Sequence, residues 1–490
     1  MSGKDDTMFE EISDAWELVV GLEVHTELKT TTKLFCGCSN QFGSEPNTNI
    51  CPVCLGLPGS LPVLNRHAVE LSIRVGLALN CTVQASLFHR KNYFYPDMPK
   101  DYQISQYDLP LNIRGHLVLP SGHRVGIERA HMEEDTGKSS HLGGSGRISS
   151  ASASLIDYNR SGVPLVEIVS APDIHTPEQA REYVSELRSV LVAVGASDGK
   201  MEEGSLRVDA NVSVRPRGST ELRTRCEIKN LNSLRSLGRA IAHEANRHIA
   251  LYESGESPTQ QTRFWDESGQ VTGALRTKEE ANDYRYFPEP DLVPLAPSQE
   301  WIQSIRDALP ELPQERREWV MDLCGEVTTN DRIETAISDE LYPFLVATLR
   351  SGLSPRRVVA RTSNELAAEL PLPNYFSTER FVEICSLEER GELTPTQVKT
   401  LLTEATHDDA PISELIARLG LVAISADSLA EIVNSVIEES PAEWTRFVEG
   451  EQQLRGFLVG KIMKASKGKA DGKVVGEMLA ERVSAAKKVG

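Results

Sequence analysis

Residues 16–28 read WELVVGLEVHTEL, and residues 205–214 read SLRVDANVSV. Both segments are rich in valine and leucine, and in the second an apolar residue recurs at every other position from Leu206 to Val214. A period of two is typical of a β-strand that buries one face. The two segments therefore predict long strands of a sheet with one apolar side.

Helical patterns lie between and after these strands. Residues 67–79 repeat apolar positions at helical spacing, and a further helical run covers about residues 233–253. Another helix is predicted to open at Thr176-Pro177-Glu178-Gln179, which combines a capping-box spacing with proline at the first helical position. Short β-like runs fill residues 85–170. We therefore expect an α+β fold for this part of the chain.

A cluster of prolines follows. Pro288, Pro290, Pro294 and Pro297 lie close together, a composition that neither a helix nor a central strand tolerates. Beyond it the pattern is helical. We therefore place a domain boundary near residue 295 and predict an all-α remainder, with helix starts at residues 310–313, 330–331, 394–397 and 425–427.

Length and composition are those of a soluble globular protein, with 490 residues, of which 40% are hydrophobic and 25% charged. This length predicts about two to four domains. No apolar stretch reaches the roughly 18 residues that a membrane span requires. The first residues, MSGKDDTMFEEISDAWE, lack the basic start and apolar run of a secretory signal, so we expect a cytoplasmic protein.

The net charge of −19 argues against nucleic-acid binding when it is averaged over the whole chain. The last 36 residues differ from this average, because residues 455–490 carry nine lysines and arginines against three acidic residues. We therefore expect the C-terminal segment to face a polyanion. The alternative is an ordinary solvated helix face.

Cys36-Gly-Cys38 and Cys51-Pro-Val-Cys54 form two close pairs of thiols. Structural zinc takes four such soft ligands in a tetrahedron, whereas a disulfide scaffold would be shorter and denser in cysteine. We therefore predict one structural Zn²⁺ held by Cys36, Cys38, Cys51 and Cys54. The alternative is four unrelated thiols.

The first predicted strand carries Glu23, His25 and Glu27 at alternate positions, which point to the same side of a sheet. Two carboxylates and an imidazole are costly to bury unless they bind something. The strand therefore offers a candidate catalytic or metal-binding face. The alternative is a solvated polar face.

The string HMEEDTGKS, residues 131–139, places three consecutive acids before Gly137. Such a run suits a loop that holds a hard cation. It ends in Gly-Lys-Ser as a P-loop does, but a P-loop would need glycine where Met132 stands, so we reject that interpretation. The alternative to a cation site is a set of structural ion pairs.

Two aromatic and basic clusters read RKNYFYPDMPK at residues 90–100 and NDYRYFP at residues 282–288. Cations suit the phosphates of a nucleotide, and rings suit its base. Tyrosine-rich loops also serve as structural plugs, which is the alternative here.

Strings from the whole chain resemble a single family. They are GLEVHTEL, RKNYFYPDMPKDYQISQYD, HMEEDTGKS, DYNRSGVPLVEIVS, KMEEGSLRVDANVSVRP, EIKNLNS, DYRYFPEPDLVPL and GFLVGKIMKASKGKA. Together they resemble the B subunit of the aspartyl/glutamyl-tRNA(Asn/Gln) amidotransferase, the GatB family, from about residue 14 to residue 490. Some members of that family lack the zinc cysteines, and this chain resembles a zinc-bearing one.

The resemblance implies an α+β fold class with three parts. These are a cradle-shaped α+β domain with the zinc knuckle over residues 14–295, an all-α helical domain over 296–405, and a small, basic, all-α tail that binds tRNA over 406–490.

The resemblance also implies a ligase. With ATP and Mg²⁺ the family phosphorylates the side-chain carboxylate of Glu-tRNA(Gln), Asp-tRNA(Asn) or both, and ammonia then displaces the phosphate. The expected partners in a heterotrimer are the A subunit, which is an amidase (glutaminase), and the C subunit, which is small and bridges the other two. A partner is needed because this chain shows no glutaminase signature of its own.

The expected catalytic residues are Glu23, His25, Glu134 and Glu167 on the GLEVH, HMEED and PLVE strings. Among them, His25, Glu134 and Glu167 are the expected Mg²⁺ ligands, and Glu167 would be costly in its apolar strand without a cation. Histidine is unusual for Mg²⁺, so Mn²⁺ is an alternative ion. The residues expected to bind the nucleotide are Lys91, Tyr93, Tyr95, Lys229 and Arg285.

Two other functions compete with this one. A non-catalytic, zinc-containing tRNA-binding module would explain the cysteines and the basic tail but would leave the acidic clusters without a role. An aminoacyl-tRNA synthetase would need a His-x-Gly-His or Lys-Met-Ser-Lys-Ser signature, and the sequence contains neither.

Overall fold

The computed structural model describes residues 14–143, 151–275, 284–325, 330–421, 426–466, 470 and 472–489. The chain divides into two compact units, Met1–Gln314 and Glu315–Gly490. No helix among the described residues is both long and apolar enough to cross a membrane.

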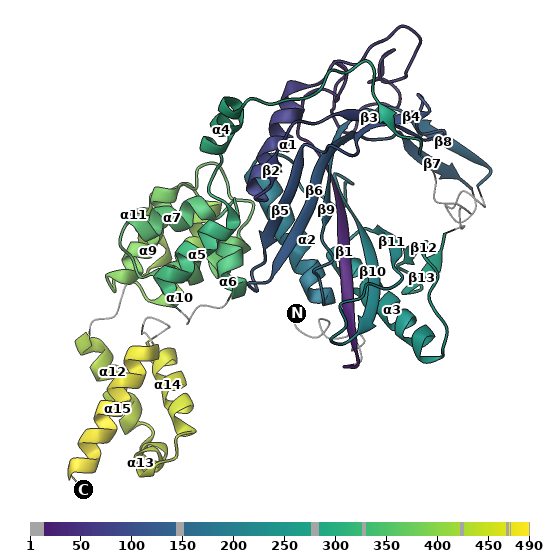
Figure 1. The fold of residues 1–490 in the computed structure, drawn as a ribbon. Coiled ribbons are helices and arrows are strands. Elements are labelled where there is room, and N and C mark those ends of the chain that lie inside the picture. Colours follow the sequence, from purple (N-terminus) through teal and green to yellow (C-terminus); the bar gives the residue numbers. More distant parts are fainter. Residues whose placement is uncertain are drawn as a thin grey trace. The chain divides into compact units, whose positions relative to one another are not determined.

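The first unit is built on a twelve-stranded sheet (Figure 1). Its strands are β1 (Trp16–Glu27), β2 (Thr82–Val83), β3 (Phe88–Asn92), β4 (Tyr102–Gln106), β5 (Asn112–Val118), β6 (Arg124–Glu134), β9 (Pro164–Ser170), β10 (Leu206–Pro216), β11 (Cys226–Leu231), β12 (Gln261–Asp266), β13 (Val271–Ala274) and β14 (Phe287–Pro288). From edge to edge the order is β13-β12-β11-β10-β1-β9-β6-β4-β3-β14, and β5 pairs with β6 and β2. A separate hairpin joins β7 (Lys138–Leu142) and β8 (Ala153–Asp157).

The two strands predicted from residues 16–28 and 205–214 are confirmed, and they are neighbours. β1 and β10 pair antiparallel, with Leu22 opposite Ala210 and Val24 opposite Val208. These side chains are fully or almost fully buried on one side of the sheet. Burying a valine or leucine stabilises the fold by about 1.5–3 kcal/mol, so this apolar side fixes which side chains must face the other way.

Three helices pack with the apolar side of the sheet in one hydrophobic core. They are α1 (Arg66–Ala78), α2 (Pro177–Ala193) and α3 (Leu234–Glu253). The predicted start of α2 is confirmed, because the Thr176 side chain accepts a hydrogen bond from the Gln179 N–H and Pro177 is the first helical residue. With the helices on that side, the charged residues of β1 and β10 project from the opposite side.

The proline-rich segment belongs to the edge of the sheet. Pro288 lies in β14, an edge strand, where a missing N–H is tolerated. Farther along, Leu295 and Ser86 exchange two backbone hydrogen bonds of 2.8 and 2.9 Å. The following helix, α4 (Gln299–Asp307), packs against α1 in the same unit.

The second unit is helical, as predicted. Its elements are α5 (Pro313–Cys324), α6 (Asn330–Ala336), α7 (Tyr342–Arg350), α8 (Pro355–Ala360), the π-helical η2 (Arg361–Leu366), α9 (Thr378–Glu389), α10 (Pro395–His407), α11 (Ile412–Leu419), α12 (Ala426–Glu438), α13 (Pro441–Glu449), α14 (Leu454–Ala465) and α15 (Gly472–Val489). The predicted capping box at Thr394 and Gln397 is present. The predicted start at Ser425 lies outside the described residues, and α12 begins at Ala426. Helices α12–α15 share a hydrophobic core of their own.

Candidate functional site

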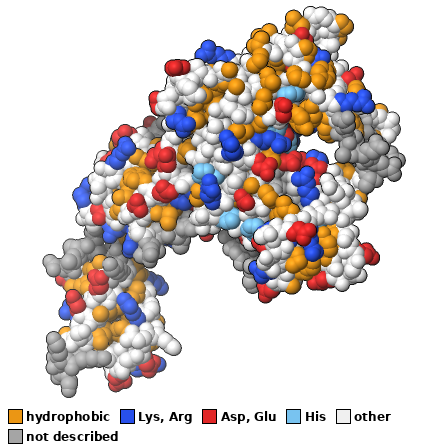
Figure 2. Space-filling model, in the orientation of Figure 1, with side chains coloured by type: hydrophobic (Ala, Val, Ile, Leu, Met, Phe, Trp, Pro, Cys, Tyr) orange, Lys and Arg blue, Asp and Glu red, His pale blue; other side chains and the backbone are white. Residues whose placement is uncertain are grey.

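The polar side of the sheet collects the charged side chains of several strands. Glu23, His25 and Glu27 alternate with buried residues along β1, as predicted. Opposite His25 stand Arg207 on β10 and Glu167 on β9. Figure 2 shows acidic side chains, with basic ones beside them, gathered in a hollow of the unit that contains the sheet.

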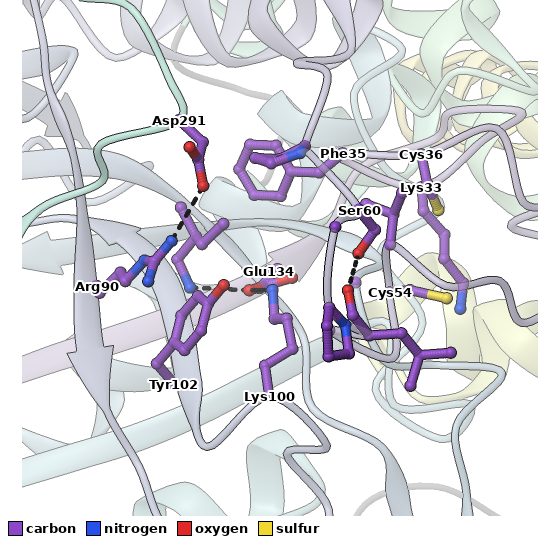
Figure 3. Close-up of a pocket in the computed structure, with 18 residues that line it drawn as sticks. Lys33, Phe35, Cys36, Cys54, Ser60, Arg90, Lys100, Tyr102, Glu134 and Asp291 are labelled. Carbon is purple, nitrogen blue, oxygen red and sulfur yellow. Dashed lines mark hydrogen bonds and ion pairs between the residues drawn. The ribbon is translucent and has the colours of Figure 1, made fainter.

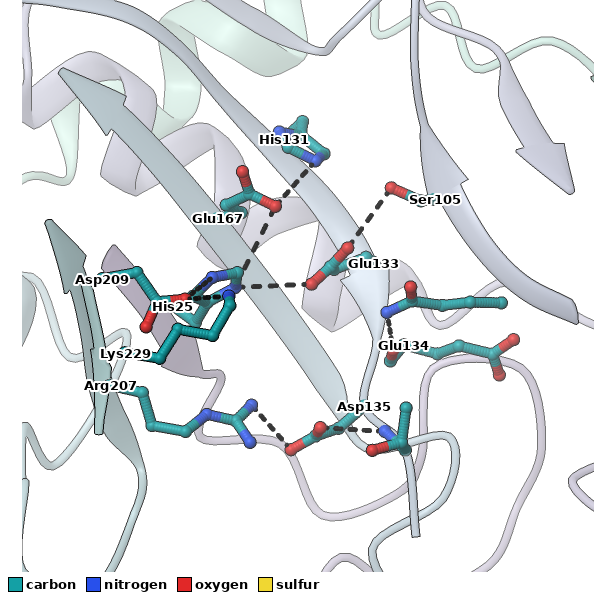
Figure 4. Close-up of polar contacts among 12 residues, drawn as sticks. His25, Ser105, His131, Glu133, Glu134, Asp135, Glu167, Arg207, Asp209 and Lys229 are labelled. Carbon is teal, nitrogen blue, oxygen red and sulfur yellow. Dashed lines mark hydrogen bonds and ion pairs between the residues drawn. The ribbon is translucent and has the colours of Figure 1, made fainter. Parts of the chain in front are cut away.

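His25 lies at the centre of this cluster (Figure 4). Its Nδ1 is 3.5 Å from a carboxylate oxygen of Glu133 and 4.0 Å from one of Glu167, and its Nε2 is 3.9 Å from one of Asp209. The four side chains are only 6–19% exposed. One imidazole is therefore surrounded by three carboxylates in a largely buried place.

The predicted trio of His25, Glu134 and Glu167 is corrected at one position. His25 and Glu167 do converge, but the third carboxylate is that of Glu133. Glu134 points to the other side of β6 because this segment is a strand through Glu134 and not the predicted loop, so successive side chains alternate. Pairing with β9, which sets Glu133 opposite Leu165, fixes which of the two glutamates faces His25.

Glu134 lines a separate pocket of about 280 Å³ (Figure 3). There its carboxylate is ion-paired with the Lys100 ammonium and accepts a hydrogen bond of 2.8 Å from the Ile104 N–H. Arg90, which is ion-paired with Asp291 at 3.3 Å, lines the same pocket. The Glu134 side chain is therefore satisfied by protein groups.

Neighbouring residues hold the cluster in place. The Nε2 of His131, directly opposite Glu167 in the strand register, is 3.5 Å from the Glu167 carboxylate. Ser105 on β4 donates a hydrogen bond of 3.4 Å to Glu133. Farther along β1, Glu23 accepts a hydrogen bond of 2.9 Å from Asn211. Glu23 therefore lies on the predicted face, two residues before His25 on the same strand.

The protonation states follow from burial and from these neighbours. Burial favours the neutral ring of His25, but the hydrogen bond to Glu133 and the charges of Glu167 and Asp209 outweigh burial and raise the pKa of His25 to about 9. Burial and the charge of Glu167 raise the pKa of Glu23. Burial favours the protonated form of Glu133, but the hydrogen bond from His25 and the charges of His25 and Lys91 outweigh burial and lower the pKa of Glu133 to about 2.

His25, Glu133 and Glu167 each offer one ligand atom, and these atoms lie within 4.8 Å of one another. The imidazole of His25, which must give up its proton to the incoming cation, suits Mn²⁺ together with two carboxylates, and the carboxylates suit Mg²⁺. Three carboxylates surround one imidazole, and a divalent cation would relieve this excess of acids. The residues present therefore fit such an ion.

Lys91 on β3 faces the same cluster. Its ammonium lies 4.7 Å from the ring centroid of Tyr284. Burial favours the neutral amine, but the charge of Glu133 and of other neighbours outweighs burial and raises the pKa of Lys91. Lys91 makes no ion pair within the described part of the chain, so it is a cation suited to a phosphate.

The other predicted nucleotide-binding residues lie at different places around the cluster. Lys229 is ion-paired at 2.8 Å with both Asp209 and Glu227. Its ammonium therefore neutralises these two carboxylates in the first place. Tyr93 and Tyr95 stack on each other with ring centroids 4.8 Å apart. Arg285 is exposed, and its carbonyl accepts a hydrogen bond of 2.9 Å from Asn92.

The four predicted zinc cysteines converge. The ligand atoms of Cys36, Cys38, Cys51 and Cys54 lie within 4.8 Å of one another, and the sulfurs of Cys51 and Cys54 are 3.9 Å apart. Tetrahedral zinc with bonds of about 2.3 Å requires sulfurs about 3.8 Å apart. The hydrogen bond from Cys36 and the charge of Lys33 lower the pKa of Cys54 to about 5, which favours a thiolate. This cluster could hold a metal ion such as zinc.

A third group, Cys226, Glu244 and His248, also meets the geometric criterion for a metal site. Here the carboxylate of Glu244 is already paired with Arg247 at 2.6 Å and lies 3.3 Å from Arg263. Two guanidinium groups repel a metal cation. We therefore interpret this group as a buried structural ion network.

Sequence reasoning missed Glu133, His131 and Asp209 in the cluster, and it missed Lys100 in the separate pocket that Glu134 lines. Part of the signal was available. The alternation that placed Glu23 and His25 on one face also places His131 and Glu133 on one face, and it sets Asp209 among the polar positions of SLRVDANVSV. Lys100 had no such signal, because it lies in a turn before β4 and reaches Glu134 through the tertiary fold.

Comparisons with known proteins point to a single family. The GatB/GatE catalytic domain matches residues 18–303, and the GatB domain matches residues 344–483. Three similar proteins are each named as the B subunit of an aspartyl/glutamyl-tRNA(Asn/Gln) amidotransferase. The one from Moorella thermoacetica is 46% identical over 484 residues, which cover 96% of this chain and 100% of the relative. Those from Cutibacterium acnes and Thermoanaerobacter sp. (strain X514) are each 45% identical, covering 97% and 96% of this chain and 99% of each relative.

Proposed function

The chain belongs to the GatB family of aspartyl/glutamyl-tRNA(Asn/Gln) amidotransferase B subunits, and from this we propose that it phosphorylates and then amidates the side chain of a misacylated tRNA. The substrate is Glu-tRNA(Gln), Asp-tRNA(Asn) or both, and the phosphoryl donor is ATP. The chain is thus the ligase component of an amidotransferase, working in the cytoplasm.

One observation carries this proposal, the convergence of His25, Glu133 and Glu167 beside the cationic Lys91. Phosphoryl transfer depends mainly on positioning and on neutralising charge. A structural ion-pair network would balance its acids with protein cations, as the one around Glu244 does. The cluster at His25 leaves its acids in excess, which supports a site for Mg²⁺ or Mn²⁺.

Each group has a part in the reaction. A divalent cation bound by His25, Glu133 and Glu167 would neutralise charge on the transferred phosphoryl group. Lys91 holds phosphate oxygens by a charge-assisted hydrogen bond. A carboxylate oxygen of the substrate attacks the γ-phosphorus, and ADP leaves. The nitrogen of ammonia then attacks the activated carbonyl carbon, inorganic phosphate leaves, and the amide remains on the tRNA.

Ammonia has to come from outside this chain. Its four clustered cysteines suit metal binding, and the sequence carries no glutaminase signature. We therefore assign glutamine hydrolysis to an amidase, the A subunit, which is joined to this chain through the small C subunit in a heterotrimer. The zinc cluster lies in the knuckle and has a structural part, because four thiolates leave no open position for a substrate.

The decisive experiment measures ADP release from ATP by the assembled complex, with and without misacylated tRNA. Stimulation of ADP release by Glu-tRNA(Gln) or Asp-tRNA(Asn), and not by the correctly charged tRNA, is expected. A complex that binds tRNA tightly but releases no ADP would instead indicate a non-catalytic tRNA-binding module.

A further inference from the structure

Three tyrosines connect Lys91 to the molecular surface. The Lys91 ammonium lies over the ring of Tyr284, and Tyr284 meets Tyr286 edge to face with ring centroids 6.1 Å apart. Tyr286 in turn stacks on Tyr107, with centroids 4.0 Å apart and planes inclined by only 7°. The three rings come from two distant segments of the sequence and form one continuous aromatic series.

The backbone fixes this series at the border of the carboxylate cluster. Tyr107 follows the last residue of β4, two positions after Ser105, whose hydroxyl contacts Glu133. Tyr286 precedes Phe287, which pairs with Arg90, the neighbour of Lys91 on β3. Burial raises the pKa of Tyr286, and the charges of Glu133 and Glu167 add to that rise while Lys91 opposes it. The Tyr286 hydroxyl therefore lies within electrostatic reach of the cluster.

The outer ring of the series is open. Tyr107 is 55% exposed although Tyr286 covers one of its faces. A structural plug would bury its terminal ring in the core, whereas this ring is held by stacking on Tyr286 and by an edge contact with His89, at 6.1 Å between centroids, and is still more than half exposed. Flat aromatic faces of this kind stack nucleobases, and neighbouring cations hold the phosphates.

We propose that the exposed face of Tyr107, backed by Tyr286, is a stacking subsite for an adenine base whose nucleotide reaches the His25 cluster past Lys91. The subsite deepens the proposed function and rests on it. Two sources supply an adenine there, the ATP that donates the phosphoryl group and the terminal adenosine of the tRNA, which carries the amino acid. Both must approach the same cluster for the transfer to occur.

The test compares equilibrium binding by the assembled complex carrying wild-type, Tyr107→Leu or Tyr107→Phe chains. The probes are ATP with Mg²⁺ and two forms of the tRNA, with and without the terminal adenosine. Leucine keeps an apolar contact with Tyr286 but removes the aromatic face, and phenylalanine keeps it. Phe42→Leu removes an aromatic ring that is 75% exposed elsewhere and serves as the matched control.

Loss of one base stack weakens binding about 5- to 150-fold. Weaker ATP binding by Tyr107→Leu alone would identify the base of ATP. If the wild type binds tRNA with the terminal adenosine more tightly than tRNA without it, and Tyr107→Leu loses only this difference in affinity, the tRNA supplies the base. Either result supports the subsite, provided that Tyr107→Phe and Phe42→Leu bind as wild type does.

Unchanged binding of both probes to Tyr107→Leu would overturn the subsite. So would a loss that Tyr107→Phe shares, because phenylalanine keeps the aromatic face and the loss would then come from the missing hydroxyl and not from stacking. Since binding is measured without turnover, these outcomes are separate from failure of the proposed function, which would appear as absent tRNA-dependent ADP release in the wild type.

Discussion

Glu133 and Glu134 are adjacent in the sequence but serve opposite sides of β6. A carboxylate oxygen of Glu133 is 3.5 Å from His25, whereas Glu134 is ion-paired with Lys100 in a separate pocket. Two neighbouring glutamates therefore lie in two different environments, and these environments predict different consequences of mutation.

Glu133→Gln should fold normally and bind tRNA, but tRNA-dependent ADP release and amidation should fall together by about 100-fold or more, because charge neutralisation at the cluster is lost. Glu134→Gln leaves the buried Lys100 without its counter-charge and should lower the free energy of unfolding by about 3–5 kcal/mol. Chemical unfolding and ADP release measured on both variants separate the two effects. Near-normal ADP release by Glu133→Gln would remove this residue from the site.

Glu133 and Glu134 also show which part of the site can be predicted from the sequence and which part cannot. Alternation along residues 205–214 predicted which side of β10 is buried, and the alternate positions of Glu23 and His25 in residues 16–28 predicted that both lie on one face of β1. It could not identify Glu133, because residues 131–137 were interpreted as a loop. Their strand register is decided by pairing with β9, a contact between distant parts of the chain. Local pattern predicts a strand, whereas tertiary pairing decides which of two neighbouring acids meets His25.

Close spacing made the cysteine cluster easier to predict. The purified chain should contain one equivalent of zinc, and Cys54→Ser should lose it, lower the thermal stability of the knuckle and expose the remaining thiols to a thiol reagent. Cys81→Ala is the matched control, because Cys81 is buried outside the cluster, and this variant should retain zinc. Wild-type protein that contains no zinc, with all four thiols freely titratable, would contradict the site.

The ion network at Glu244 predicts a pH dependence of stability. Burial alone would favour the protonated acid, but hydrogen bonds from His248, Arg247 and Thr272 outweigh burial and hold the pKa of Glu244 well below its usual range. A depressed folded-state pKa contributes stability above the unfolded pKa of about 4.3, and this contribution is lost as the pH falls below it.

Glu244→Gln should therefore cost about 3–5 kcal/mol at neutral pH, because Arg247 loses its buried counter-charge. The difference from wild type should stay constant above about pH 5 and should narrow toward about pH 3.5. Urea unfolding of both proteins across this range gives the difference directly. A gap that does not narrow at the acidic end of the range would show that Glu244 is not charged in the folded protein.

The proposed division of labour between subunits makes a prediction about the nitrogen donor. Without the proposed amidase partner, the chain should form amidated tRNA from ammonium chloride but not from glutamine, and adding the amidase should restore the use of glutamine. Mass spectrometry of the amino acid released from the tRNA measures both. Release of ammonia from glutamine by the isolated chain would mean that it contains a glutaminase site of its own.

The last prediction concerns the basic C-terminal segment. Residues 455–490 carry nine lysines and arginines, and Lys467, Lys469, Lys473, Lys487 and Lys488 lie among the side chains that are not described. The helices that carry the segment, α14 and α15, share a hydrophobic core with α12 and α13, built around side chains such as Val433, Leu458 and Leu479. Removing residues 425–490 should therefore leave the sheet unit and its proposed ATP binding intact.

If these cations contact tRNA phosphates, the deletion should raise the KM for tRNA and reduce the slope of log affinity against log salt by about 0.7–0.9 for each lost contact. Replacing Lys461 and Lys464 with glutamine in the full chain should reduce the same slope by the amount expected for up to two lost contacts, while the fold is retained. This variant separates the loss of charge from the loss of the whole segment. Affinity titrations between about 50 and 200 mM salt supply the slopes. An unchanged slope after the deletion would show that the segment is only a solvated helical surface and that tRNA is bound elsewhere.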